Sequence, residues 1–214
     1  MMRASRGLVL GTAAVFGLCC SSGVAAAGDY ATKAEIAELA VCYAIAADTL
    51  GEGKTQADPA AAGLAMLRKC FTEDATFAIW PAGTPFDSLT SPSRTGDKPP
   101  AVVIPGLTTF ASAISSSFAA AGGVGYDFVQ HKLSNIVVDI EGDSAKLNAY
   151  VESTHVIQAT EPFTPTRCRQ QTNGTYTMKA KKIEGKWLLT SFDLAQIAFD
   201  TIIENGDGCS APAP

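Results

Sequence analysis

The spacing of apolar positions predicts helices in the first half of the chain. Apolar residues recur at helical spacing over Thr32–Leu50, and Thr32 with Glu35 fits a capping box at the start of that helix. Asp58-Pro59 predicts the start of a short second helix, and the pattern over residues 107–121 predicts a third. Three helices are therefore expected before residue 122.

Alternating apolar and polar positions predict two long antiparallel hairpins between Phe128 and Phe192. The first hairpin begins with HKLSNIVVDI at His131, reverses at residues 141–144 and returns as AKLNAYVESTHVIQ. The second pairs GTYTMKAKKI with KWLLTSFDLA across the turn Glu184-Gly185. An earlier strand is predicted for ATFAIW, which Pro81 terminates.

The order of these elements predicts an α+β fold, in which about three helices pack on one face of a strongly curved antiparallel sheet. Residues 81–105 are dense in Pro, Gly, Ser and Thr, so they are predicted to form a long loop. This loop is either a lid over a cavity or a surface excursion. The sequence shows no internal repeat and no second domain.

The N-terminus has the features of a secretory signal peptide. Two arginines precede the apolar run of residues 7–20, and the small residues Ala25–Ala27 follow it, which predicts cleavage after Ala27. The run is shorter than the roughly 20 residues that a membrane helix needs, so stable membrane insertion is not expected. We expect an exported chain, periplasmic or extracellular, with a domain over residues 28–203 and a tail over 204–214.

Composition and charge argue for one globular domain and against nucleic-acid binding. The 214 residues are 47% hydrophobic and 17% charged, which suits a sizeable core. Without residues 1–27, 14 basic and 21 acidic side chains remain, a net charge of −7. Lysines 179, 181 and 182 are the one basic cluster, and they alternate along a strand as a solvated face does, whereas a phosphate backbone requires grouped cations.

The four cysteines that follow residue 27 suggest disulfides, because the chain is predicted to be exported. Cys42 lies on the same helix side as Glu35 and Glu38, a reasonable position for a bridge to a neighbouring helix. We therefore predict Cys42–Cys70, and also Cys168–Cys209, which would tie the tail to a loop between strands. Free thiols are the alternative. No Cys-x-x-Cys or Cys-His spacing is present, so no metal site is expected.

Asp48 and His131 are the candidate acid-base residues. Asp48 lies on an apolar stripe of the first helix, and His131 begins a strand at an inward position. The structural alternatives are that Asp48 lies in solvent at a frayed helix end and that His131 is a core residue. Tyr43 offers a hydroxyl one turn before Asp48, and His155 shares the inward phase but is predicted to be structural. The candidates for the ligand-binding wall, with core packing as the alternative, are Tyr150, Tyr176, Asn135, Phe110 and Trp80.

Several motifs in order resemble the SnoaL-like branch of the nuclear transport factor 2 superfamily over about residues 30–200. They are CYAIAAD, CFTEDATF, the third helix, QHKLSNIVVDIEGDSAKLNAY and YTMKAKKIEGKW. The resemblance implies a cone-shaped, cystatin-like roll with an interior cavity. Its members include polyketide cyclases, scytalone dehydratase, steroid isomerases and epoxide hydrolases, and many have no assigned activity. The resemblance therefore does not specify the reaction.

Overlaying the scytalone dehydratase site supports two of the candidates. Its helix-1 aspartate falls on Asp48, and its first catalytic histidine falls on His131, which follows Gln130 as in that family. Its second histidine, serine, asparagine and the tyrosine next to its aspartate have no counterpart, because their positions fall on Asn148–Tyr150, Gly174, Tyr176 and Ala47. Scytalone dehydration itself is therefore not expected.

Two functional hypotheses follow from the sequence. In the first, the protein is a cofactor-independent lyase, isomerase or cyclase, in which Asp48 and His131 exchange a proton with a small apolar molecule and Tyr43 or Tyr150 polarises its oxygen. In the second, it is a non-catalytic ligand-binding or structural module that forms a homodimer through the outer face of the sheet.

Overall fold

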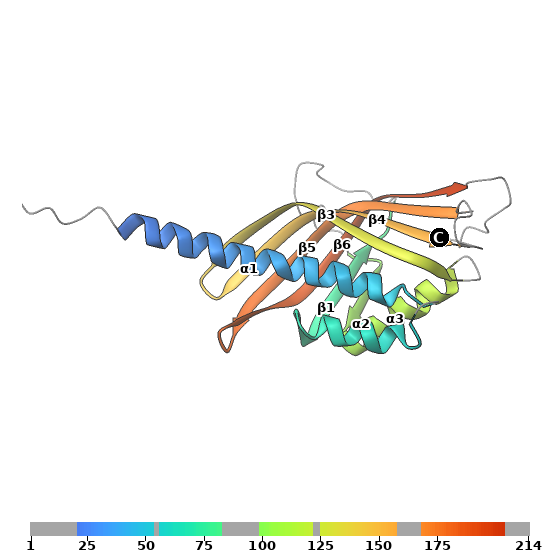
Figure 1. Ribbon diagram of the computed structural model, residues 1–214, viewed down its shortest axis with the longest axis horizontal. Coiled ribbons are helices and arrows are strands. Elements are labelled where there is room, and N and C mark those ends of the chain that lie inside the picture. Colours follow the sequence, from blue (N-terminus) through green and yellow to red (C-terminus); the bar gives the residue numbers. More distant parts are fainter. Residues whose placement is uncertain (1–20, 54–55, 83–98, 122–124, 158–167, 204–214) are drawn as a thin grey trace, which may run out of the picture.

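Three helices and six strands make up the part of the chain that the computed structural model describes, residues 21–53, 56–82, 99–121, 125–157 and 168–203. This composition confirms the predicted α+β class. In chain order (Figure 1), the elements are α1 (Ser21–Leu50), α2 (Pro59–Leu67), β1 (Phe71–Trp80), β2 (Val102–Pro105), α3 (Leu107–Ala120), β3 (Tyr126–Glu141), β4 (Ser144–Ile157), β5 (Cys168–Ile183) and β6 (Lys186–Ile203).

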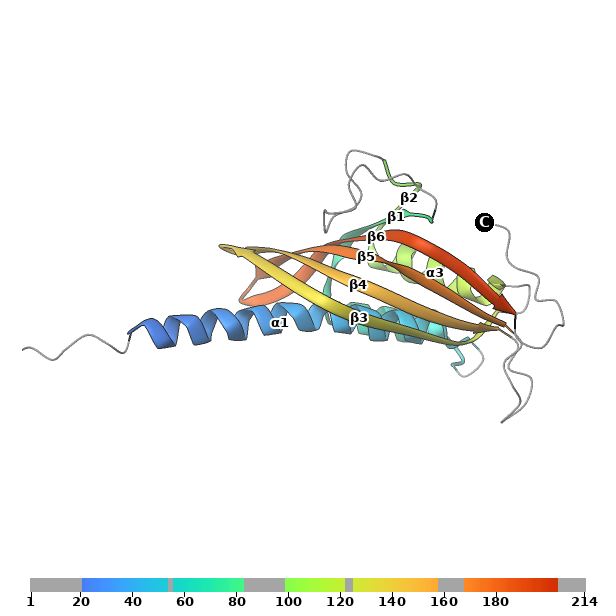
Figure 2. The same ribbon diagram turned by 90° about the horizontal axis from the view of Figure 1, so that it is seen from above.

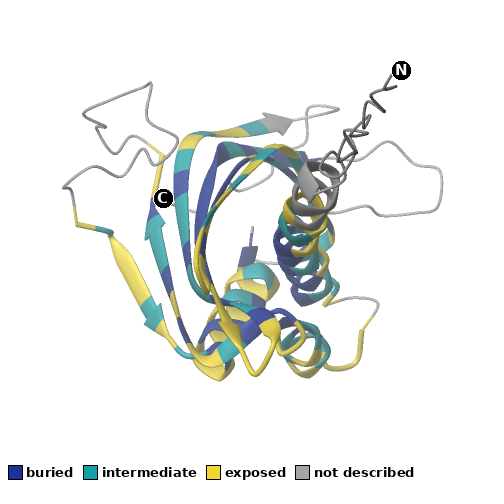
Figure 3. Cartoon of the chain, turned by 90° about the vertical axis from the view of Figure 1, so that its left-hand side faces the viewer, coloured by how far each residue is buried: buried dark blue, intermediate teal, exposed yellow. Residues whose placement is uncertain are grey.

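The strands form one sheet in the order β2-β1-β6-β5-β4-β3. Every neighbouring pair is antiparallel except β1 and β6, which run parallel, so the sheet is mixed rather than wholly antiparallel. The sheet curves around the helices, and α1 runs alongside β3 at the edge of the sheet (Figure 2). Seen along the length of the molecule, buried residues line the inner side of this curve (Figure 3).

Local signals in the sequence explain where two elements begin and end. The Asp58 side chain accepts a hydrogen bond from the backbone N–H of Ala61 at 2.9 Å, and Pro59 occupies the first position of α2, so the predicted helix start is confirmed. Glu184 and Gly185 join β5 to β6 with φ angles of 52° and 83°. Positive φ at both central residues is the signature of a type I′ hairpin turn, so the predicted turn is also confirmed.

The core lies between the helices and the concave face of the sheet. Small residues of α1 let the helix backbone approach the sheet closely, while aromatic rings fill the space beside it. The rings of Phe77 and Phe110 stack with centroids 3.7 Å apart. The large side chains that are almost wholly buried include Ile36, Leu50, Leu107, Leu147, Met178, Leu189 and Phe192. Burying each contributes roughly 1.5–3 kcal/mol relative to exposure.

The first helix begins earlier than predicted. It starts at Ser21, not at Thr32, so Thr32 lies within the helix and does not cap it. The segment before Thr32 is rich in alanine, the residue with the highest helix propensity, and it contains no proline. The predicted cleavage position after Ala27 falls within α1, and residues 1–20 lie outside the described part of the chain.

A short strand replaces the end of the predicted long loop. Residues Val102–Pro105 form β2 and pair with Thr76–Ile79 of β1, so the loop prediction is wrong for these residues. The β-branched run Val-Val-Ile favours a strand, and Pro105 is tolerated because β2 is at the edge of the sheet and ends there. Residues 83–98, to which the lid hypothesis mainly refers, lie outside the described residues.

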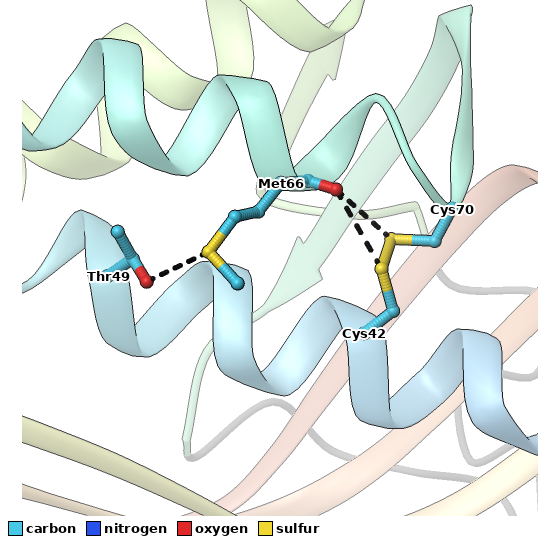
Figure 4. The surroundings of a disulfide bond; sticks show 4 residues. All are labelled: Cys42, Thr49, Met66 and Cys70. Atoms are coloured by element: carbon cyan, nitrogen blue, oxygen red, sulfur yellow. Dashed lines mark hydrogen bonds between the residues drawn. A yellow bond between two sulfur atoms is a disulfide. The ribbon is translucent and has the colours of Figure 1, made fainter.

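The structure joins Cys42 to Cys70, as the sequence predicts. The bridge links α1 to the turn that precedes β1, with the two Cα atoms 6.2 Å apart (Figure 4). Both sulfur atoms lie 3.8 Å from the carbonyl oxygen of Met66. Cys168 is also disulfide-bonded, but it is the first residue of β5 rather than part of a loop; Cys209, its predicted partner, lies outside the described residues, as does the rest of the 204–214 tail.

Removing the Cys42–Cys70 bridge should destabilise the protein. The two cysteines are 28 residues apart, and closing a loop of this length reduces the entropy of the unfolded chain, which corresponds to about 3.5 kcal/mol. We expect Cys42→Ser and the double variant Cys42→Ser/Cys70→Ser to lose similar free energies of unfolding in a denaturant titration, because both open the same loop. A loss below about 1 kcal/mol in the double variant would contradict this account.

Candidate functional site

A cavity of about 130 Å³ lies between the helices and the concave face of the sheet. Side chains from α1, α3 and five of the six strands border it, so its walls come from most of the chain. Most of these side chains are apolar. Those with possible chemistry or a predicted role are Tyr43, Phe110, His131, His155 and Tyr176.

Asp48 holds His131 at the wall of this cavity through two contacts with one carboxylate oxygen. Asp48 Oδ1 accepts a hydrogen bond from the backbone N–H of His131 at 2.8 Å and lies 2.7 Å from the ring nitrogen Nδ1. The Asp48 side chain is 26% exposed and that of His131 only 8%, so the pair is largely shielded from water. A carboxylate only accepts hydrogen bonds, so the contact assigns the proton to Nδ1 and leaves Nε2 with its lone pair.

The position of β3 explains why this contact forms. β3 is the last strand of the sheet, so the backbone N–H groups on its outer side have no neighbouring strand to receive them. The last turn of α1 lies alongside β3 and brings Asp48 to the N–H of His131. The same carboxylate therefore satisfies the sheet edge and orients the imidazole.

Tyr43 and Tyr176 form a second polar pair in the cavity wall. Their ring centroids are 5.4 Å apart and their planes are almost perpendicular, and the two hydroxyls are hydrogen-bonded to each other. Burial raises the pKa of both hydroxyls well above the ordinary value, and the hydrogen bond to Tyr176 opposes this in part for Tyr43. Both phenols therefore stay protonated near neutral pH, so one O–H of the pair is left to donate to a ligand.

The other residues predicted for the wall divide into two groups. Phe110 borders the cavity together with Tyr176. Trp80 is buried, but at the end of β1 and outside the cavity lining, and Tyr150 is 47% exposed on the outer face of the sheet. Asn135 is exposed, with a φ of 52°, at a register shift in β3. The structure therefore brings Phe110 and Tyr176 to Asp48 and His131, but not the other three.

The sequence analysis missed a block of polar side chains beside His131. Register pairs His131 with Ser153, and Ser153 with Thr172, so these three form one row across β3, β4 and β5. In the next row, His155 is paired with Gln170. Period-two alternation places Ser153 on the same face as Val151 and His155, and this signal could have identified it.

His155 points inward, as its strand phase predicts, and its environment keeps it neutral. The residue is 6% exposed, its ring stacks on Tyr126 with centroids 4.7 Å apart, and Phe118 and His131 provide the other neighbouring rings. Burial, with a smaller contribution from the charge of His131, lowers the pKa of His155 to about 3. Burial also raises the pKa of Tyr126 to about 12, and its hydroxyl donates to Gln170 Oε1 at 2.6 Å.

Two kinds of feature are absent from the described residues. No group of three or more His, Cys, Asp and Glu side chains there could hold a metal ion. Nor does any helix in those ranges combine the length and the apolar character needed to cross a membrane.

The low pKa of His155 predicts a loss of stability on acidification. Between pH 6.5 and about 3, His155 binds a proton in the unfolded chain but not in the folded protein. The free energy of unfolding therefore falls progressively as pH decreases through this range. One such proton is equivalent to about 1.4 kcal/mol per pH unit. As pH is lowered, the free energy of unfolding from denaturant titrations should therefore fall more steeply for the native sequence than for His155→Phe. Equal slopes for the native chain and His155→Phe would contradict the assignment.

Solved structures share this fold. A protein called Kfla4162 from Kribbella flavida is 26% identical, with a TM-score of 0.51, and the match covers 78% of this chain and 91% of that one. A hexachlorocyclohexane dehydrochlorinase (LinA, type 2) is 14% identical, with a TM-score of 0.54 and coverage of 87% and 95%. A nuclear transport factor 2-like protein from Salmonella enterica serovar Typhimurium is 14% identical, with a TM-score of 0.54 and coverage of 84% and 99%.

No curated protein matches the chain. The SnoaL-like domain family matches residues 29–193, a range that runs from α1 into β6 and includes Asp48, His131 and most of the residues that border the cavity. The chain therefore belongs to the SnoaL-like domain family.

Proposed function

We propose that this protein is an exported, cofactor-independent enzyme that removes a proton from a small, mostly apolar molecule, as a lyase or isomerase does. The observation that carries the proposal is the contact of Asp48 Oδ1 with His131 Nδ1 at the wall of a mostly apolar cavity. A histidine with one nitrogen held by a carboxylate presents the other as a base, the arrangement that general-base catalysis requires.

His131 is the proposed base, and Asp48 positions it. His131 Nε2 would take a proton from a C–H group of the ligand, and Asp48 would stabilise the imidazolium that forms. In an elimination, the electrons of the C–H bond form a C=C bond and the leaving group departs with its own bonding pair. In an isomerisation, the proton returns to a different carbon. Tyr43 would donate its O–H to an oxygen of the ligand, which stabilises the negative charge that develops there.

The name of one structural relative describes chemistry of this kind. A dehydrochlorinase removes hydrogen and chlorine from a substrate, which is an elimination. At 14% identity that relative shows a common fold alone. The choice of proton abstraction for this chain therefore rests on the Asp48–His131 geometry.

Export and self-association are also part of the proposal. The N-terminal pattern of charge, apolar run and small residues supports export to the periplasm or the extracellular space, and the Cys42–Cys70 disulfide is compatible with it. Val137, Tyr150 and Ile197 are 54%, 47% and 43% exposed. Large apolar side chains exposed on the outer face of β3, β4 and β6 support a homodimer through this face of the sheet.

A non-catalytic ligand-binding module is the second candidate function. The enzyme hypothesis offers Tyr150 as an alternative to Tyr43 for polarising a ligand oxygen. Tyr150 is exposed and does not border the cavity, so it cannot have that role, and its position favours the second candidate. Such a module would retain the cavity and the inward histidines, but it would not move protons to or from carbon.

Exchange of carbon-bound hydrogen separates these two candidates. Cyclohexanone has acidic C–H groups beside a carbonyl and is a single ring, and its exchange in D₂O can be followed by ¹H NMR. We expect the native protein to accelerate this exchange and His131→Gln to lose the acceleration, since general-base catalysis contributes about 10²- to 10⁴-fold. Asp48→Asn should slow exchange about 10- to 100-fold, because an amide of the same size no longer stabilises the imidazolium.

Asp139→Asn is the matched control, because Asp139 is an exposed aspartate on the same strand as His131. It should exchange cyclohexanone at the native rate. If the ketone binds, as judged by shifts of cavity methyl groups, but exchange stays at the rate of buffer alone, the ligand-binding module would be the correct description.

A further inference from the structure

A block of polar side chains on the concave face has no role in the Asp48–His131 chemistry. Ser153 and Thr172 are cross-strand partners, as are His155 and Gln170, so the four side chains lie side by side on β4 and β5. All are buried, with exposures of 3%, 4%, 6% and 0%, respectively. Such a group is unusual in a cavity whose other walls are mostly apolar.

Several polar atoms of this block have no hydrogen-bond partner among the described residues. They are both ring nitrogens of His155, the Thr172 hydroxyl and the Gln170 side-chain nitrogen. A buried polar group left without a hydrogen bond costs about 1–3 kcal/mol, and such groups are rare in native proteins. His155 and Thr172 border the cavity, so a molecule within it can satisfy them.

The chemistry of these atoms restricts the molecule that fits. A neutral imidazole offers one donor and one acceptor, and a hydroxyl can act as either, so together they suit a hydroxyl or carbonyl oxygen. Among the described residues that border the cavity, none is Lys or Arg, so an anion would lose its hydration without gaining a cation. An uncharged ligand is therefore favoured.

The size and the walls of the cavity restrict the ligand further. Its volume is about 130 Å³, and an apolar cavity of about 150 Å³ holds benzene. Phe110, Ile114 and Phe118 of α3 form an apolar wall beside the polar block. The ring centroids of His131 and His155 are 5.9 Å apart, so an oxygen held by His155 leaves nearby ring carbons within reach of His131.

We propose that the cavity binds an uncharged single-ring molecule whose hydroxyl or carbonyl oxygen is held by His155 and Thr172. This subsite rests on the proposed function, since it names the class of molecule that the same cavity takes. Gln170 supports it as the neighbour of His155, and the apolar wall of α3 receives the ring. His155 is thus a binding residue rather than a purely structural one.

Phenol and toluene provide a direct test, because they have nearly the same size and phenol has a hydroxyl where toluene has a methyl group. Their affinities can be measured by NMR titration of the methyl groups of Ile79, Ile114, Val151 and Leu194, which border the cavity. The native protein should bind phenol roughly ten-fold more tightly than toluene, the effect of satisfying buried polar groups. In His155→Phe and Thr172→Val the two affinities should become nearly equal.

Thr175→Val is the matched control. Thr175 lies on β5 like Thr172, is 2% exposed and also has a hydroxyl without a partner, but it does not border the cavity. This variant should keep the native preference for phenol. A native protein that prefers phenol but does not accelerate ketone exchange would reject the proposed base and leave the subsite intact.

Three results would overturn the subsite. Equal affinity of the native protein for phenol and toluene would show that water alone satisfies the polar block. Equal loss of preference in Thr175→Val would show an indirect effect of packing. Binding of 2-naphthol as tightly as phenol would contradict the limit to one ring. If His155→Phe does not fold, Thr172→Val, which preserves side-chain shape, decides the outcome.

Discussion

The bend of the sheet is the constraint on which the cavity depends. β3 to β6 are 14 to 18 residues long, and a flat sheet of such strands would leave α1 and α3 to pack directly on it. Register shifts interrupt β3 between Ser134 and Val137 and the β5–β6 pair between Asn173 and Gly174. Because bulges of this kind increase the local twist and bend a strand, the sheet curves around the helices and leaves a space that their side chains do not fill completely.

The contact of α1 with the edge of this sheet both stabilises the edge strand and orients the His131 ring. Asp48 accepts the backbone N–H of His131, a group that a sheet edge otherwise leaves to solvent, and it orients the ring of the same residue. Tyr43 follows Cys42, the residue whose disulfide fastens α1 to the turn before β1. The helix that positions His131 is thus fixed on two sides, and a site held on regular elements in this way keeps its geometry better than one built on loops.

The period-two pattern of the hairpins predicted which way most side chains point, and it failed where the backbone departs from that period. His131, His155 and Tyr176 face the interior as the alternation predicts. Asn135 does not, because the shift in β3 inserts an extra residue and reverses the phase of the residues after it. Tyr150 lies between the buried Ala149 and Val151, so the same alternation places it on the outer face of the sheet and not in the cavity wall. The parallel pairing of β1 with β6 could not be predicted, since local patterns contain no information on which distant strand is the partner.

That pairing has a consequence for how the chain acquires its structure. Phe77 of β1 is the register partner of Phe192 of β6, and β1 lies between β6 and the short edge strand β2. The N-terminal half therefore has no complete sheet to pack on until nearly the whole polypeptide has left the ribosome. Contacts between such distant positions are slow to form because loop closure precedes the gain from pairing. The core of this topology therefore closes late in folding, once β1 has paired with β6.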